Sequence, residues 1–149
     1  VIDDNTDIVF LDRRLPDSSG SKILHTLRER GNTDQIALLT AVDADFDILS
    51  LPLDEYVHKP VSKEAFTTTA QQLLRRSQYE QSLRELHELA AKCAALESAK
   101  STTELNGSEE YQQLLEEFEA AQETAHEQLK QFEPRDYRRE FKRLLLSSA

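Results

Sequence analysis

Three short apolar segments, each followed by a reactive polar side chain, constrain the fold of this chain most strongly. The first runs from Asp7 to Asp12, the second ends at Thr40, and the third ends just before Lys59. Segments that alternate with helix-like stretches in this way are typical of a parallel sheet with right-handed crossovers. Because the carboxyl ends of such strands lie at one edge of the sheet, Asp12, Thr40 and Lys59 are predicted to converge there.

A carboxylate, a hydroxyl and an ammonium group at one point have the chemistry of a phosphoryl-transfer site. Asp12 would be the nucleophile, Thr40 would donate to a phosphate oxygen, and Lys59 would supply the opposite charge. A strand-end aspartate taken by itself is more often a cap or turn residue. The prediction therefore depends on the three groups together.

The pattern predicts strands and helices in strict alternation up to residue 62. Gly31 is expected to end the first helix, and Ser62 to cap the last one. The predicted strands are residues 7–12, 35–40 and 55–58, and the predicted helices are residues 20–30, 43–50 and the segment that begins at residue 62.

Two heptad stripes follow. One runs from Tyr79 to Cys93 and the other from Tyr111 to Phe132, and a polar loop with a glycine, residues 101–107, separates them. Stripes of this kind predict a coiled-coil hairpin of two antiparallel helices. After Pro134 the sequence predicts a separate basic amphipathic helix over residues 135–146.

Further positions around the strand ends resemble the receiver domain of two-component response regulators. In this resemblance Asp12 matches the phosphorylated aspartate, Thr40 the switch hydroxyl, and Lys59 the lysine that precedes a proline. Tyr56, three residues before that lysine, matches the switch aromatic. The other matches are the loop Leu15-Pro16 with Gly20, the small residue Ala41, and Pro60, whose bond to the lysine is typically cis in the family.

The resemblance implies the α/β class, with a partial flavodoxin-like parallel sheet, and an Mg2+ site beside Asp12. The metal would need the carbonyl of Arg14 and an acidic pair at the end of the family's first strand. Asp3 and Asp4 look like such a pair, but residues 1–6 read better as the end of the family's second helix and its loop. The sequence therefore predicts a receiver that lacks two strands, two helices and the acidic pair, so that Asp12 and Arg14 alone would not make a competent metal site.

Four motifs also resemble haloarchaeal receivers that carry a helical extension, the HalX domain. They are Leu-Asp-Arg-Arg-Leu-Pro, Leu-Thr-Ala-Val-Asp-Ala-Asp-Phe-Asp, Leu-Leu-Arg-Arg-Ser-Gln-Tyr-Glu and Leu-Asn-Gly-Ser-Glu-Glu-Tyr. We therefore expect three parts. Residues 1–76 would be the partial receiver, residues 77–133 the HalX-like hairpin, and residues 134–149 the basic C-terminal helix.

The composition disfavours several classes of protein. With a net charge of −10, the chain repels nucleic acid except where basic charge is concentrated. The basic residues between Arg135 and Arg143 offer such a concentration, but a solvated helix face over an apolar docking surface is the favoured interpretation. No stretch approaches the about 20 apolar residues of a membrane span. Cys93 is the one cysteine, so a reducing cytoplasm is expected.

Two functions from different classes fit these observations. The first is a response regulator that a sensor histidine kinase phosphorylates on Asp12 and that passes the signal to its helical hairpin. The alternative is a vestigial receiver that acts as a coiled-coil interaction module without phosphorylation. In either case we expect no independent enzymatic activity, and we expect the hairpin to self-associate into a homodimer, because one hairpin buries too little apolar surface to be very stable.

Overall fold

The computed structural model describes residues 7–14, 19–41 and 51–147, without the side chains of residues 144–147. The chain divides into two compact units. The first contains Val1–Ser77 and Glu133–Ala149, and the second contains Gln78–Phe132. Three sequence features lie outside the described residues: the Asp3-Asp4 pair, the Leu15-Pro16 loop and the predicted helix at residues 43–50. In the part of the chain that the structure describes, no helix is long and apolar enough to cross a membrane.

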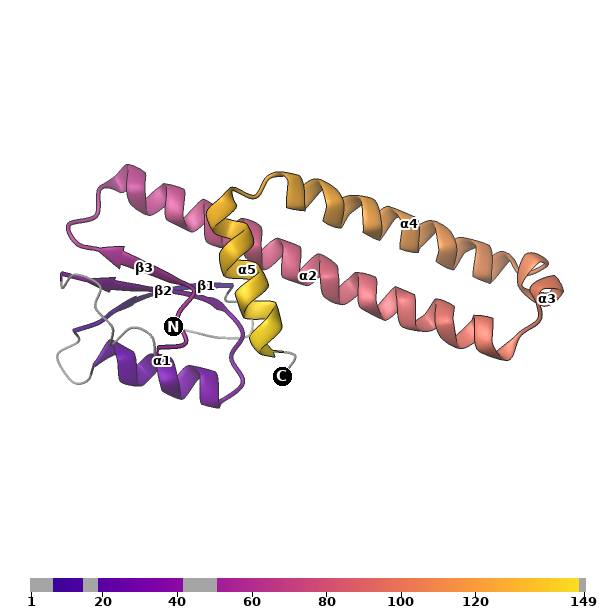
Figure 1. Cartoon of the computed structure of the whole chain (residues 1–149), viewed down its shortest axis with the longest axis horizontal. Coiled ribbons are helices and arrows are strands. Elements are labelled where there is room, and N and C mark those ends of the chain that lie inside the picture. Colours follow the sequence, from indigo (N-terminus) through magenta and orange to yellow (C-terminus); the bar gives the residue numbers. More distant parts are fainter. Residues whose placement is uncertain (1–6, 15–18, 42–50, 148–149) are drawn as a thin grey trace. The chain divides into compact units, whose positions relative to one another are not determined.

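A parallel sheet organises the first unit. Its strands are β1 (Ile8–Asp12), β2 (Gln35–Thr40) and β3 (Glu55–His58), in the order β1-β2-β3 (Figure 1). Asp12 is level with Leu39, and Thr40 is level with His58. The three predicted strands and their parallel pairing are confirmed, and their carboxyl ends lie at one edge.

Helix α1 (Gly20–Glu29) covers one face of the sheet. Ser19 begins it by accepting a hydrogen bond from the amide of Lys22 at 3.2 Å, and Gly31, with φ of 81°, follows its end. Alternate strand residues face this helix because side chains in a strand point to opposite sides. The resulting hydrophobic core lies between α1 and strands β1 and β2. Its buried side chains are Val9, Leu11, Leu24, Ile36 and Leu38.

The opposite face meets helix α2 (Lys63–Ala99), of which residues 63–77 belong to the first unit. Ser62 caps it by accepting from the amide of Ala65 at 3.0 Å. The ring of Phe66 packs against Phe10 of β1 with centroids 4.3 Å apart. Helix α5 (Pro134–Ser147) belongs to this unit as well, so the basic C-terminal segment is part of the same compact body as the sheet.

The second unit is an antiparallel helical pair. It contains the rest of α2, the short α3 (Thr102–Asn106) and α4 (Glu109–Lys130). Tyr79 packs edge-on against Phe132 at 5.1 Å, and the hydroxyl of Tyr111 donates to Glu97 at 2.8 Å. The middle of α2 thus meets the residues just after α4, and the end of α2 meets the start of α4, which confirms the predicted hairpin.

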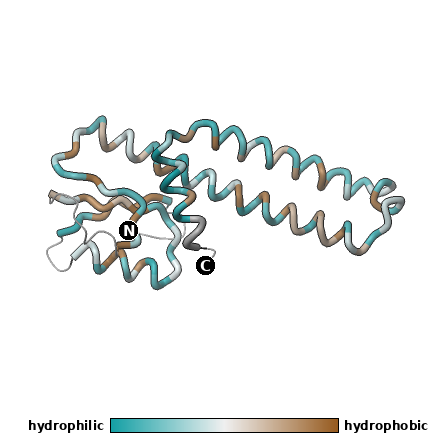
Figure 2. Tube along the Cα trace, viewed as in Figure 1, coloured by the Kyte–Doolittle hydropathy of each residue, from teal (hydrophilic) through white to brown (hydrophobic). Residues whose placement is uncertain are grey.

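The connection between the two long helices differs from the expected turn. Residues 102–106 form a turn of helix because Ser101 accepts a hydrogen bond from the amide of Glu104 at 3.2 Å. Ser108 then caps α4, as predicted, by accepting from Tyr111 at 3.1 Å. Strands β1 and β2 are mostly apolar, whereas α4 is mostly polar (Figure 2), in keeping with a pair of helices that buries only one narrow stripe.

Candidate functional site

Asp12 and Lys59 are in direct contact at the carboxyl edge of the sheet. The Nζ atom of Lys59 forms an ion pair with Oδ2 of Asp12, and the amide of Arg14 donates to Oδ1 at 2.9 Å. Both side chains remain about one-third exposed, at 34% for Asp12 and 37% for Lys59. An incoming reagent can therefore reach the carboxylate from solvent.

These contacts fix the protonation state of the carboxylate. The hydrogen bond from Lys59, followed by the one from the amide of Arg14, holds the pKa of Asp12 below its usual range. Asp12 is consequently ionised at neutral pH. The ionised form is the one that can act as a nucleophile.

Thr40 lies on the central strand between the other two groups. The amide of Lys59 donates to its carbonyl at 2.6 Å, which ties the segment after β3 to the end of β2. The Thr40 side chain is only 3% exposed. Lys59 is joined to Pro60 by a cis peptide bond, as the resemblance implied.

Tyr56 lies further back on β3. It is half-buried and packs against the apolar core that α1 and the sheet share. The site residues of the sequence prediction are therefore found in two layers, with Asp12, Thr40 and Lys59 at the sheet edge and Tyr56 in the core beneath it.

Gly20 lies directly against the backbone of Asp12. A Cβ atom at this position would lie 2.1 Å from the carbonyl oxygen of Asp12, closer than any side chain tolerates. The amide of Gly20 also donates to the carbonyl of Arg13 at 2.7 Å. The start of α1 can therefore approach the end of β1 only because residue 20 has no side chain.

The described residues do not by themselves form a magnesium site. Mg2+ is usually held by one or two carboxylates together with phosphate oxygens and water. Both Asp12 oxygens already accept hydrogen bonds, and the described residues contain no group of three His, Cys, Asp or Glu side chains that could hold a metal ion.

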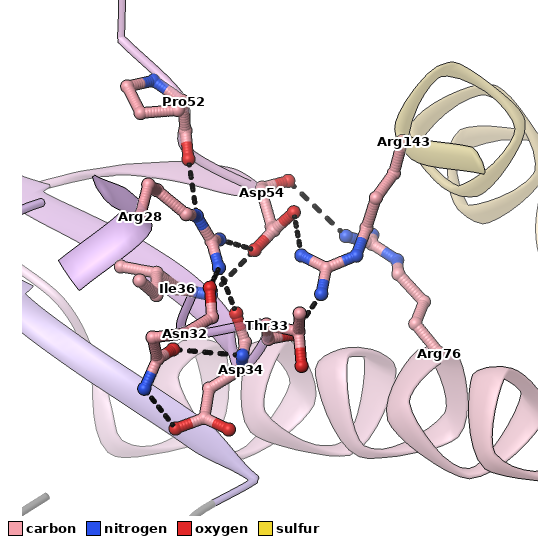
Figure 3. Close-up of polar contacts among 9 residues, drawn as sticks. All are labelled: Arg28, Asn32, Thr33, Asp34, Ile36, Pro52, Asp54, Arg76 and Arg143. Carbon is pink, nitrogen blue, oxygen red and sulfur yellow. Dashed lines mark hydrogen bonds and ion pairs between the residues drawn. The ribbon is translucent and has the colours of Figure 1, made fainter. Parts of the chain in front are cut away.

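Sequence reasoning missed a second polar cluster at the opposite end of β3. One carboxylate oxygen of Asp54 forms an ion pair with Arg28 at 2.6 Å, and the other forms one with Arg143 of α5 at 2.7 Å (Figure 3). The sequence predicts a solvated basic face on this helix, but Arg135 and Arg143 are paired within the first unit. A readable signal was the spacing of Arg135, Arg139 and Arg143, which places three arginines on one face of a helix.

Comparison with known proteins supports both parts of the resemblance. A HalX domain matches residues 75–141. A protein of Haloferax volcanii, named as a transcriptional regulator, is 43% identical over 97 residues, which are 65% of this chain and 17% of that protein. The transcriptional regulatory protein TcrX of Mycobacterium tuberculosis is 43% identical over 74 residues, which are 48% of this chain and 32% of TcrX.

A solved structure was also found. It is the signal receiver domain of a protein from Vibrio parahaemolyticus described as a LuxO repressor, with a TM-score of 0.47 and 19% identity over 50% of this chain and 60% of that one. The chain spans no more than about a third of the length of the two curated relatives, 17% and 32%. This chain thus combines a segment homologous to the receiver domains of response regulators with a HalX domain.

Proposed function

We propose that this chain is the signal-receiving part of a response regulator, with Asp12 as the phosphoacceptor. The observation that supports this most directly is the ionised Asp12 carboxylate, which is open to solvent and held against Lys59 at the edge where three parallel strands end. The homology to response regulators implies a histidine kinase as the general class of partner. We also propose that the chain acts in the cytoplasm.

The proposed reaction is transfer of one phosphoryl group. A carboxylate oxygen of Asp12 attacks the phosphorus of a phosphohistidine on the kinase. The phosphorus–nitrogen bond breaks, its electron pair returns to the imidazole, and an acyl phosphate forms on Asp12. The new group carries roughly −1.5 to −2 charges. Lys59, already bound to Oδ2, would stay beside the phosphoryl oxygens and offset that charge.

The response would then spread along two strands. Thr40 would turn its hydroxyl toward a phosphoryl oxygen, and Tyr56 would move within the apolar core. Receiver domains typically bind Mg2+ for this transfer. The described residues do not complete a site for that ion.

An interaction module without phosphorylation is the second candidate. It is favoured by the contacts of Asp12, whose two oxygens are satisfied by Lys59 and the Arg14 amide. In this proposal the hairpin of α2 and α4 would be the working part, as a coiled coil that forms a homodimer. Nucleic acid is not a proposed partner, because residues 78–132 contain 12 acidic and 4 basic side chains.

A phosphodonor assay separates the two candidates. The chain is incubated with radiolabelled acetyl phosphate and Mg2+, and incorporated label is measured. We expect labelling that Asp12→Asn abolishes. Asp7→Asn is the matched control, because Asp7 is exposed just before the same strand and should leave labelling unchanged. Absence of label from the wild-type chain would support the interaction module instead.

A further inference from the structure

The two points where the chain passes between its units are joined by a buried ion pair. The chain leaves the first unit after Ser77 and re-enters it at Glu133. Arg76, next to the first point, donates from Nε to Oδ1 of Asp136 at 2.8 Å. Both side chains are 1% exposed. The second carboxylate oxygen of Asp136 accepts a hydrogen bond from the amide of Glu133 at 3.1 Å. This bond also fixes the first turn of α5.

The same arginine is bound to β3. Its Nη2 atom lies 3.2 Å from Oε2 of Glu55, which is 2% exposed. Its Nη1 atom donates to the carbonyl of Asp54 at 3.4 Å (Figure 3). Glu55 is the first residue of β3, and Tyr56 follows it directly. One guanidinium group therefore connects β3 to α5 through residues of the first unit that are close in sequence to its two boundaries with the second unit.

Helix α5 adds further contacts to the carboxylates of Glu55 and of its neighbour Asp54. Arg135 pairs with Oε1 of Glu55, and Arg139 lies 3.8 Å from that atom. Two turns from Arg135, Arg143 donates to Asp54 at 2.7 Å and also to the carbonyl of Thr33. We call the buried set Glu55, Arg76 and Asp136 the clamp; the arginines of α5 hold the helix over it.

Burial makes the clamp behave as one body. Removing one member of a buried ion pair leaves the others charged and unpaired, which is strongly unfavourable. Water also screens such pairs far less than exposed ones. A shift of β3 that separated Glu55 from Arg76, or Arg76 from Asp136, would therefore be costly.

We propose that the clamp couples β3 to the two joints of the helical hairpin, with Arg76 as the positioning residue. This inference rests on the proposed function: phosphorylation of Asp12 would disturb β3, and Glu55 would pass the displacement through Arg76 to α5 and to the adjoining turn of α2.

Hydrogen exchange of the full chain tests the coupling. Beryllofluoride with Mg2+ serves as the phosphoryl mimic, and amide exchange is compared in β3 and in residues 134–147. In the wild type we expect changes in both. In Arg76→Met we expect the change in β3 alone. Arg84→Met is the control, because Arg84 is an exposed arginine on the same helix, and it should respond like the wild type.

A measurement without the mimic keeps the coupling testable if the proposed function fails. Loss of a buried partner should speed exchange in α5 by about a hundredfold or more in Arg76→Met. Glu55→Gln alone should also speed exchange in α5. Adding it to Arg76→Met should have a smaller effect than it has alone, because only the pairs of Glu55 with Arg135 and Arg139 then remain to be lost. Asp136→Asn, which keeps the shape of the clamp, provides the same comparison if Arg76→Met does not fold.

The results distinguish failure of the proposed function from failure of the coupling. No response of β1 to β3 to the mimic would refute the proposed function and leave the resting comparison to decide the coupling. A response of α5 in Arg76→Met equal to that of the wild type would overturn the coupling. So would independent, additive effects of the changes at Glu55 and Arg76.

Discussion

Replacing Gln35 by methionine should stabilise the first unit. Gln35 begins β2 and is 1% exposed, and neither polar atom of its side chain has a hydrogen-bond partner among the described residues. A buried, unsatisfied polar group costs about 1–3 kcal/mol. Methionine has a similar volume and no such group, so the free energy of unfolding of the sheet should rise by about that amount.

Native-state hydrogen exchange of the β1 and β2 amides measures this effect for the first unit alone. Since about 1.4 kcal/mol corresponds to a factor of ten, exchange should slow by about 5- to 150-fold. Gln71→Met, at an exposed position of α2, is the matched control and should change the free energy of unfolding by less than about 0.5 kcal/mol. Equal or faster exchange in Gln35→Met would contradict this prediction and would mean that the side-chain amide of Gln35 is hydrogen-bonded in solution.

Three further predictions concern single groups. The pKa of Asp12 is lowered in the folded chain. The ionised carboxylate therefore stabilises the fold above its unfolded pKa of about 3.9, and this stabilisation is lost as the pH falls through the lower folded pKa. Carboxyl NMR should show the pKa of Asp12 rising in Lys59→Met. The pKa of Tyr111 is raised, chiefly because its hydroxyl donates to Glu97. The stabilisation from this hydrogen bond is therefore present below about pH 10 and is lost as the pH rises through the folded pKa. Ultraviolet titration should show the pKa of Tyr111 falling in Glu97→Gln. Gly20→Ala should destabilise the first unit by about 1–3 kcal/mol in thermal unfolding, because the added methyl group overlaps the Asp12 carbonyl; an unchanged melting temperature would contradict that account.

The sequence was sufficient to predict the sheet edge. Asp12 and Lys59 are 47 residues apart, yet the rule that parallel strands end at one edge brings them together, and the ion pair between them follows from opposite charge. The hairpin was equally predictable, because the stripe through Tyr79 and Cys93 has a helical period and Ser108 is a typical cap.

The clamp could not be predicted in the same way. Arg76 and Asp136 are 60 residues apart, and periodicity indicates which face of a helix is buried but not which element covers it. Arginine and glutamate are usually solvated, so composition predicts them at the surface. The short helix α3 was readable in principle, because Ser101 followed by Glu104 is a capping box within what otherwise looks like a turn.

Chemical trapping of the acyl phosphate would identify the phosphorylated residue. After treatment with acetyl phosphate and Mg2+, borohydride reduces an aspartyl phosphate to homoserine, and peptide mass spectrometry locates the converted residue. We expect homoserine at Asp12 in the wild type and none in Lys59→Met under the same conditions. Conversion at another aspartate, or none in the wild-type chain, would contradict the assignment of Asp12 as the phosphoacceptor.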